Sequence, residues 1–153
     1  MNKWIKLIIA ILICQAAGII GSLFTFQSIP TWYATLNKPS FSPPNWLFGP
    51  AWITLYTLMG ISLYLVWEKG FSRKALYAFS IQLVLNALWS VIFFGFKLLS
   101  YAFAEIIVLW ISIAFTIFAF YKISKKAAYI LIPYIAWVSI ASILNYYVWI
   151  LNL

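Results

Sequence analysis

The sequence predicts an all-α membrane protein, a single domain over residues 1–153 built as a bundle of five transmembrane helices. Of its 153 residues, 66% are hydrophobic and only 8% are charged. Soluble domains carry roughly 25% charged residues, so this composition cannot cover a water-facing surface. Five apolar runs each reach the length of about 20 residues that crosses a bilayer, and nearly all charges fall between them. A β-barrel would instead show shorter segments of alternating polarity.

The first helix is expected at residues 4–26. Its start, MNKWIKLIIAILIC, has the lysines, apolar run and Cys14 of a lipoprotein signal. However, Ile13 stands where such a signal needs a small residue, and the apolar run continues past Cys14. We therefore interpret this segment as a retained transmembrane helix.

Residues 27–44 form an expected outer loop, long enough to act as a lid. The stretch KPSFSPPNWLFGPAW, residues 38–52, holds four of the six prolines and leads into a second helix at 45–67. Pro44 is tolerated at a helix start, where its missing N–H has no partner in any case. Pro50 lies about one turn in and is expected to bend the start of the helix or open its hydrogen bonding.

The remaining helices are expected at 75–96, 101–121 and 127–150. Charged residues separate them, with Glu68 to Lys74 before the third, Lys97 before the fourth and Lys122 to Lys126 before the fifth. Short connections make neighbouring helices antiparallel. Pro133 is expected to loosen the fifth helix.

The positive charges predict the orientation in the membrane. Eight of the ten lysines and arginines fall on the side of the N-terminus, and only Lys38 and Lys97 fall on the other. The positive-inside rule then places the N-terminus and the second and fourth connections in the cytoplasm. The long first loop and the C-terminus lie outside. Because the charges sit between apolar runs, the net charge of +8 does not indicate a nucleic-acid partner.

Several expected helices carry polar and aromatic residues on one face, spaced by three, four or seven residues. Singly, each such residue is explained by helix packing or by the aromatic belt at the membrane surface. Together they indicate a mostly apolar pocket with a few polar anchors, in the outer half of the membrane. The residues are Gln15, Gly18 and Ser22 in the first helix, Trp52, Tyr56 and Met59 in the second, Gln82, Asn86, Trp89 and Phe93 in the third, and Trp137, Ala141 and Asn145 in the fifth.

Three segments carry a resemblance to a known family: WYATLNKPSFSPPNWLFGPAWITLYTLMG, NALWSVIFFG and PYIAWVSIASILNYYVW. They resemble the signature segments of the tryptophan-rich sensory protein/translocator protein (TspO/MBR) family, also called the peripheral benzodiazepine receptor family. The resemblance implies a five-helix bundle, usually a homodimer, that binds porphyrins such as protoporphyrin IX and isoquinoline carboxamide or benzodiazepine drugs. It implies ligand contacts at Ser22, Tyr33, Pro43, Phe48, Gly49, Trp52, Asn86, Trp89, Phe93, Tyr101, Ala104, Trp137, Ala141 and Leu144.

The chain departs from the animal members of that family in ways that suit a bacterial protein of the cell membrane. Animal members bind cholesterol and carry a recognition pattern for it that ends in a basic residue after the fifth helix. This chain has Tyr146 and Tyr147 but no lysine or arginine beyond Lys126, so we do not expect cholesterol binding through that pattern, itself a weak one. Tyr101 stands where animal members have a tryptophan.

Three functions remain to be weighed. A porphyrin-binding protein is favoured, and a metal-free porphyrin more than haem, because the chain has no histidine and Cys14 lies in a lipid span. Lys38 is the best candidate to meet the porphyrin carboxylates. Facilitated transport of porphyrin or another amphipathic molecule stays open, without ion coupling, since Glu105 is the only acidic residue inside a span.

Conventional catalysis is not expected, because Glu68 and Glu105 are the only acidic residues and no dyad or triad can be assembled. The lack of histidine and the single cysteine also argue against a metal site or another bound cofactor. What the resemblance adds is a photochemical role, since Trp52 and Trp137 match tryptophans implicated in light-dependent porphyrin breakdown by some bacterial members.

Overall fold

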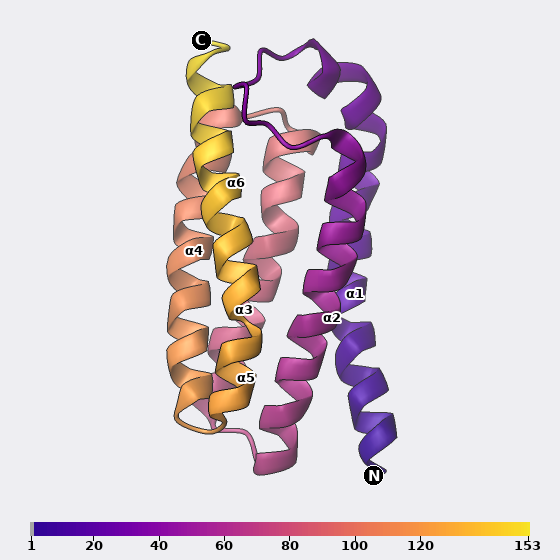
Figure 1. Ribbon diagram of the computed structural model, residues 1–153, viewed down its shortest axis with the longest axis vertical. Coiled ribbons are helices and arrows are strands. Elements are labelled where there is room, and N and C mark those ends of the chain that lie inside the picture. Colours follow the sequence, from indigo (N-terminus) through magenta and orange to yellow (C-terminus); the bar gives the residue numbers. More distant parts are fainter. Residues whose placement is uncertain (1) are drawn as a thin grey trace.

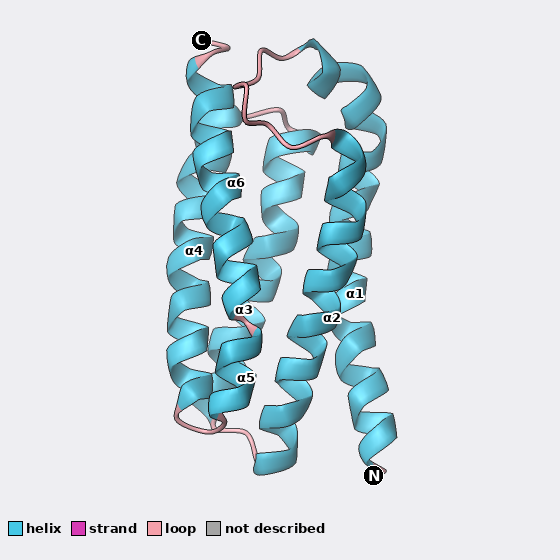
Figure 2. Cartoon of the chain, in the orientation of Figure 1, coloured by secondary structure: helices cyan, strands magenta, loops and turns pink. Residues whose placement is uncertain are grey.

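The computed structural model describes residues 2–153, and the regular structure in this range is helical (Figures 1 and 2). Five helical segments are long and apolar enough to cross a membrane, which confirms the predicted five-helix bundle. The elements are α1 (Lys3–Ser28) with the π-helical η1 (Ile29–Tyr33), α2 (Asn45–Lys69), α3 (Arg73–Ser90) with the π-helical η2 (Val91–Gly95), α4 (Leu99–Tyr121), and α5 (Lys125–Ile130) followed by α6 (Ile132–Ile150).

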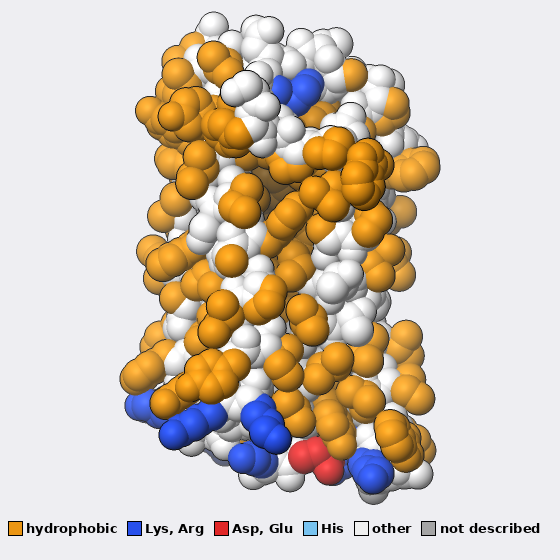
Figure 3. Space-filling view, in the orientation of Figure 1, with side chains coloured by type: hydrophobic (Ala, Val, Ile, Leu, Met, Phe, Trp, Pro, Cys, Tyr) orange, Lys and Arg blue, Asp and Glu red, His pale blue; other side chains and the backbone are white. Residues whose placement is uncertain are grey.

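The two ends of the bundle differ in charge. Figure 3 shows lysines and arginines gathered around the end that holds the N-terminus, which we call the inner end. There Lys6 Nζ lies 2.7 Å from Glu68 Oε1. The opposite, outer end holds the C-terminus and the coil of residues 36–44 (Figure 1). The charge asymmetry read from the sequence is therefore also an asymmetry of the fold.

Two hydrophobic clusters hold the helices together. The larger fills the middle and inner part of the bundle, where the rings of Phe79 and Phe120 stack with centroids 5.6 Å apart. The smaller lies at the outer end and joins η1, η2, α4 and α6; its buried members are Tyr33, Phe93, Phe94, Ala102, Leu144 and Val148. We call this second group the outer aromatic cluster.

The expected loop at 27–44 is wrong in its first half, because the chain stays helical to Thr35 and its coil spans only residues 36–44. The hydroxyl groups in this stretch find acceptors while the chain stays helical, one within the same helix and one on η2. The Thr31 hydroxyl donates to the carbonyl of Gln27 at 2.7 Å, and the Ser28 hydroxyl donates to the carbonyl of Phe94 at 3.1 Å. Tyr33 is then buried in the outer aromatic cluster.

Three of the prolines act differently at or near the helix starts. Pro44 precedes α2 as its N-cap, and α2 continues unbroken through Pro50, which removes one helical N–H donor. Pro133 lies beside a real interruption, in agreement with the predicted loosening of the fifth helix. The fifth span is interrupted at Leu131, and Pro133 falls in the first turn of α6, where a proline costs no hydrogen bond.

A candidate ligand-binding cavity

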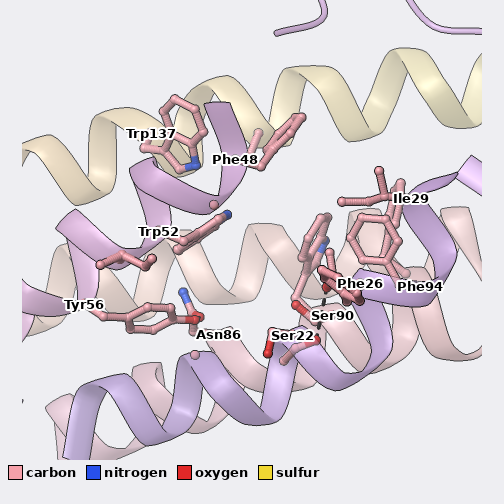
Figure 4. A pocket seen from close by; sticks show the side chains of 18 of the residues that line it. Ser22, Phe26, Ile29, Phe48, Trp52, Tyr56, Asn86, Ser90, Phe94 and Trp137 are labelled. Atoms are coloured by element: carbon pink, nitrogen blue, oxygen red, sulfur yellow. Dashed lines mark hydrogen bonds between the residues drawn. The ribbon is translucent and has the colours of Figure 1, made fainter. Parts of the chain in front are cut away.

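A cavity of about 660 Å³ lies in the outer half of the bundle. Its walls come from α1, η1, α2, α3, η2, α4 and α6, so every span contributes. Figure 4 shows α1 on one side and α6 on the other, with Trp52 and Tyr56 of α2 projecting between them. The predicted pocket in the outer half thus has a physical counterpart of a size typical of small-molecule sites.

Eleven of the fourteen residues expected to contact a ligand line this cavity. They are Ser22, Tyr33, Phe48, Gly49, Trp52, Asn86, Trp89, Phe93, Trp137, Ala141 and Leu144. Whether they bind a ligand stays a prediction.

Pro43, Tyr101 and Ala104 do not line the cavity. Pro43 belongs to the coil, which supplies no lining residue. Tyr101 is 67% exposed and Ala104 is also exposed, because α4 buries the face that carries Ala102, Ile106 and Leu109 instead. On α4 it is Ile106 and Leu109 that reach the cavity.

Other lining residues were not among the expected ligand contacts. Gln15, Gly18, Tyr56 and Asn145 lie on the helix faces that the sequence pattern had singled out, so their spacing was a usable signal. Phe26, Ile29 and Phe94 had no such signal. Ile29 was hidden by the expected loop, which η1 replaces.

A buried chain of hydrogen bonds, which we call the polar network, crosses the floor of the cavity. The Tyr56 hydroxyl donates to Asn86 Oδ1, Asn86 Nδ2 donates to the Tyr134 hydroxyl at 2.8 Å, and that hydroxyl donates to Gln82 Oε1 at 2.9 Å. Tyr56 and Asn86 face the cavity in Figure 4. Because α2, α3 and α6 all take part, the network fixes these helices relative to one another.

Trp89 is held in one orientation at the back of the cavity. Its indole N–H donates to Asn145 Oδ1 at 3.0 Å, and Asn145 Nδ2 in turn donates to the carbonyl of Leu99 at 3.1 Å. Its ring stacks on Phe93 with centroids 4.8 Å apart. The π-face of Trp89 is therefore presented by α3 with support from α4 and α6.

Two further tryptophans border the cavity from the opposite walls. Trp52 of α2 lies 5.6 Å from the ring of Tyr56. Trp137 of α6 meets the ring of Phe48 edge-on, with centroids 6.2 Å apart. Figure 4 shows Trp137 on α6 and Phe48 and Trp52 on α2, where these two helices border the cavity. A flat aromatic molecule in the cavity would have indole rings on several sides.

The walls carry no formal charge: among the described residues, none that lines the cavity is a lysine, arginine, aspartate or glutamate. Lys38 is tied down outside it, since its ammonium donates to the carbonyls of Tyr33 at 2.8 Å and Leu36 at 3.0 Å. Within residues 2–153 no cluster of side chains suited to a metal ion is present. The cavity is built for binding through apolar surface, π-faces and neutral hydrogen-bonding groups.

Comparison with known proteins gives consistent results. The model of the TspO/MBR family matches residues 10–150. The tryptophan-rich protein TspO of Archaeoglobus fulgidus is 47% identical over 150 residues, covering 97% of each chain. The human translocator protein is 42% identical over 135 residues, covering 85% of this chain and 80% of its own. The tryptophan-rich sensory protein of Cereibacter sphaeroides is 34% identical over 143 residues, covering 94% and 89%.

Proposed function

The chain belongs to the TspO/MBR family of membrane proteins, and from this we propose that it binds a flat aromatic ligand in the outer cavity. The ligand class is a porphyrin of the protoporphyrin IX type, or a drug-like molecule of the isoquinoline carboxamide or benzodiazepine kind. Binding, rather than conventional catalysis, is the primary activity.

The observation that carries this proposal is the set of three tryptophans, Trp52, Trp89 and Trp137, around one cavity. Each aromatic contact adds about 0.5–1.5 kcal/mol beyond the burial of area. Three indole rings held by separate helices suit a rigid, flat aromatic ligand better than a flexible, chain-like one. The cavity volume of about 660 Å³ suits a ligand of this size.

The neutral walls refine the proposal. A porphyrin carries two acidic tails, and burying a carboxylate without a partner is costly. The plate is therefore expected to lie among the tryptophans with its tails directed out of the cavity. Because the chain has no histidine, a metal-free porphyrin is the preferred form.

Tryptophan-fluorescence titration with protoporphyrin IX in the dark tests the proposal on detergent-purified protein. We expect saturable quenching in the wild type. The variant Trp52→Phe/Trp137→Phe should raise the Kd by about three- to tenfold, because two aromatic contacts are weakened.

Trp4→Phe/Trp67→Phe is the matched control, since it removes the same number of tryptophans from positions outside the cavity. Its Kd should equal that of the wild type. Quenching that never saturates and is the same in all three proteins would contradict the proposal, because it would mean that the porphyrin only partitions into the micelle.

The same proteins test the photochemical role of Trp52 and Trp137. After binding in the dark, illumination should destroy bound porphyrin more slowly in Trp52→Phe/Trp137→Phe than in the wild type, at matched occupancy. Equal rates would leave these tryptophans with a binding role alone.

A further inference from the structure

In the inner half of the bundle, α1 and α2 are in direct contact. A methyl group built on Gly60 would lie 2.5 Å from the Cα atom of Ile11, so the two backbones touch there. One step outward, Gln15 Nε2 donates to the carbonyl of Ile53 and to the hydroxyl of Thr57, both at 3.0 Å. Nothing the size of a ligand can pass between the helices at this level.

In the outer half, this contact is lost at Gly49. A methyl group built there would meet no atom within 4 Å, and Gly49 both lines the cavity and is exposed at the protein surface. Ser22 lies on α1 seven residues after Gln15, hence on the same helix face. It too lines the cavity and is exposed. The cavity therefore reaches the outside between α1 and α2, through an opening that we call the lateral window.

The rim of the lateral window is apolar and turned toward lipid. Phe26 is 82% exposed, Trp46 is 72% exposed and Ile53 is 62% exposed, although all three line the cavity. Trp46 and Trp67 are 21 positions apart on α2, which corresponds to about 31 Å of helix and matches the ~30 Å hydrocarbon core. With these tryptophans at the two membrane surfaces, the window opens into the outer half of the hydrocarbon.

Toward the water at the outer end, the cavity is covered by side chains and by the coil. The outer aromatic cluster lies between the cavity and that end, and the coil is fastened above it. Asn37 N donates to Asn152 Oδ1 and Asn152 Nδ2 donates to the Asn37 carbonyl, both at 2.9 Å. The rings of Phe41 and Tyr147 add an edge contact at 5.4 Å. We call this fastening the clasp.

The seam between α2 and α6 is also bridged. The space-filling view shows a hollow in the apolar surface below the coil, between these two helices (Figure 3). There the rings of Phe48 and Trp137 meet. At the lateral window, by contrast, Gly49 leaves space that no side chain fills, since a methyl group there would meet no atom within 4 Å.

We infer that ligands enter and leave the cavity sideways, from the outer half of the membrane, through the lateral window at Gly49. This inference rests on the proposed function and narrows it. The ligand class is one that dissolves in lipid, a flat amphipathic molecule that reaches the protein by diffusion within the bilayer.

Filling the window tests the inference through rates. Gly49→Phe places a ring in the open space without straining α2, since any residue other than proline favours a helix more than glycine does. With the protein in nanodiscs and protoporphyrin IX delivered from donor vesicles, stopped-flow tryptophan quenching gives association and displacement gives dissociation. Both rates should fall, association by about tenfold, because an obstructed passage slows entry and exit whatever contact Gly49 also makes with a bound ligand. Ala16→Phe, on an exposed position of α1 outside the cavity, should leave both rates unchanged.

A locked clasp supplies the opposing test. Asn37→Cys/Asn152→Cys, in a Cys14→Ala background, is compared with itself after oxidation to the disulfide and after reduction. Equal rates in the two states are expected. If the association and dissociation rates fall on oxidation and Gly49→Phe has no effect on them, the inference is overturned, because the ligand then enters from the water. If Phe48→Ala binds and releases the ligand faster than the wild type, and Gly49→Phe leaves both rates unchanged, the ligand enters between α2 and α6 instead.

Equilibrium binding separates the two proposals. If Gly49→Phe raises the Kd and leaves association unchanged, Gly49 is a contact and the lateral window is refuted while ligand binding stands. If the wild type shows no saturable binding at all, the proposed function fails and the window fails with it.

Discussion

Asn86 connects three helices through a single side chain. Its amide oxygen accepts from Tyr56 of α2 and its amide nitrogen donates to Tyr134 of α6. In a membrane interior no water replaces a lost partner, so an unpaired hydroxyl there is costly. Measured side-chain hydrogen bonds between membrane helices nevertheless average only about 0.6 kcal/mol and reach about 2 kcal/mol. The polar network is therefore expected to contribute modestly to stability and more to holding the cavity floor in one arrangement.

A double-mutant cycle measures this contribution. Asn86→Leu should lower the free energy of unfolding by about 1–3 kcal/mol, because it leaves the buried Tyr56 hydroxyl without an acceptor and removes the donor to the Tyr134 hydroxyl, which keeps only its bond to Gln82. Tyr56→Phe should cost less, and the double variant less than the sum, since both changes remove the same bond. Thermal unfolding in detergent gives the values. Strict additivity would mean that the Tyr56–Asn86 bond contributes nothing.

At the level of single residues, helical spacing and transfer of positions from the family each predicted eleven of the residues that line the cavity. Gln82 and Asn86 are almost completely buried, as their shared face implied. Tyr101 and Ala104 were transferred by resemblance and lie on the exposed side of α4. The rotation of α4 is set by burial of Ala102, Ile106 and Leu109 against its neighbours, a packing outcome that one sequence does not contain.

At the scale of elements, α2 uses two glycines in opposite ways. Gly60 allows close contact with α1, because a methyl group there would lie 2.5 Å from the Ile11 Cα atom. Gly49 allows an opening, because a methyl group there would meet nothing within 4 Å. The same residue type thus closes the inner half of the α1–α2 seam and opens the outer half.

Alanine at each position separates the two roles. Gly60→Ala should destabilise the protein by about 1–3 kcal/mol, because a backbone contact must be pushed apart. Gly49→Ala should be neutral or stabilise by up to about 1 kcal/mol, because alanine favours the helix. Thermal unfolding of both variants under one set of conditions provides the comparison. Equal destabilisation would show that α1 and α2 are packed together along their whole length.

The helices themselves followed from apolar length, but their irregular ends did not. Five spans were predictable because about 20 apolar residues are needed to cross a bilayer. The π-helical η1 and η2 were not, since they depend on distant contacts such as the bond from Ser28 to the Phe94 carbonyl. The break at Leu131 was predictable in part. Pro133 predicted a disturbance of the fifth helix, and the structure adds its position.

For the whole molecule, the distribution of charge links the fold to the direction in which the cavity opens. The inner end carries most of the lysines and arginines, and the cavity lies in the other half (Figure 3). Cytoplasmic loops of membrane proteins are enriched in these residues. If the inner end is cytoplasmic, the cavity and the lateral window belong to the outer leaflet. The orientation therefore decides from which leaflet a ligand would be taken.

Cysteine labelling determines this orientation. Ser40 is exposed in the coil at the outer end, and Lys74 is exposed at the inner end. The variants Ser40→Cys and Lys74→Cys are each made in a Cys14→Ala background. A membrane-impermeant maleimide added to intact cells should label Ser40→Cys only, because the positive-inside rule keeps the basic connections in the cytoplasm. After permeabilisation both variants should react, which controls for accessibility. Labelling of Lys74→Cys alone in intact cells would show that the protein has the opposite orientation. The lateral window would then take its ligand from the cytoplasmic leaflet.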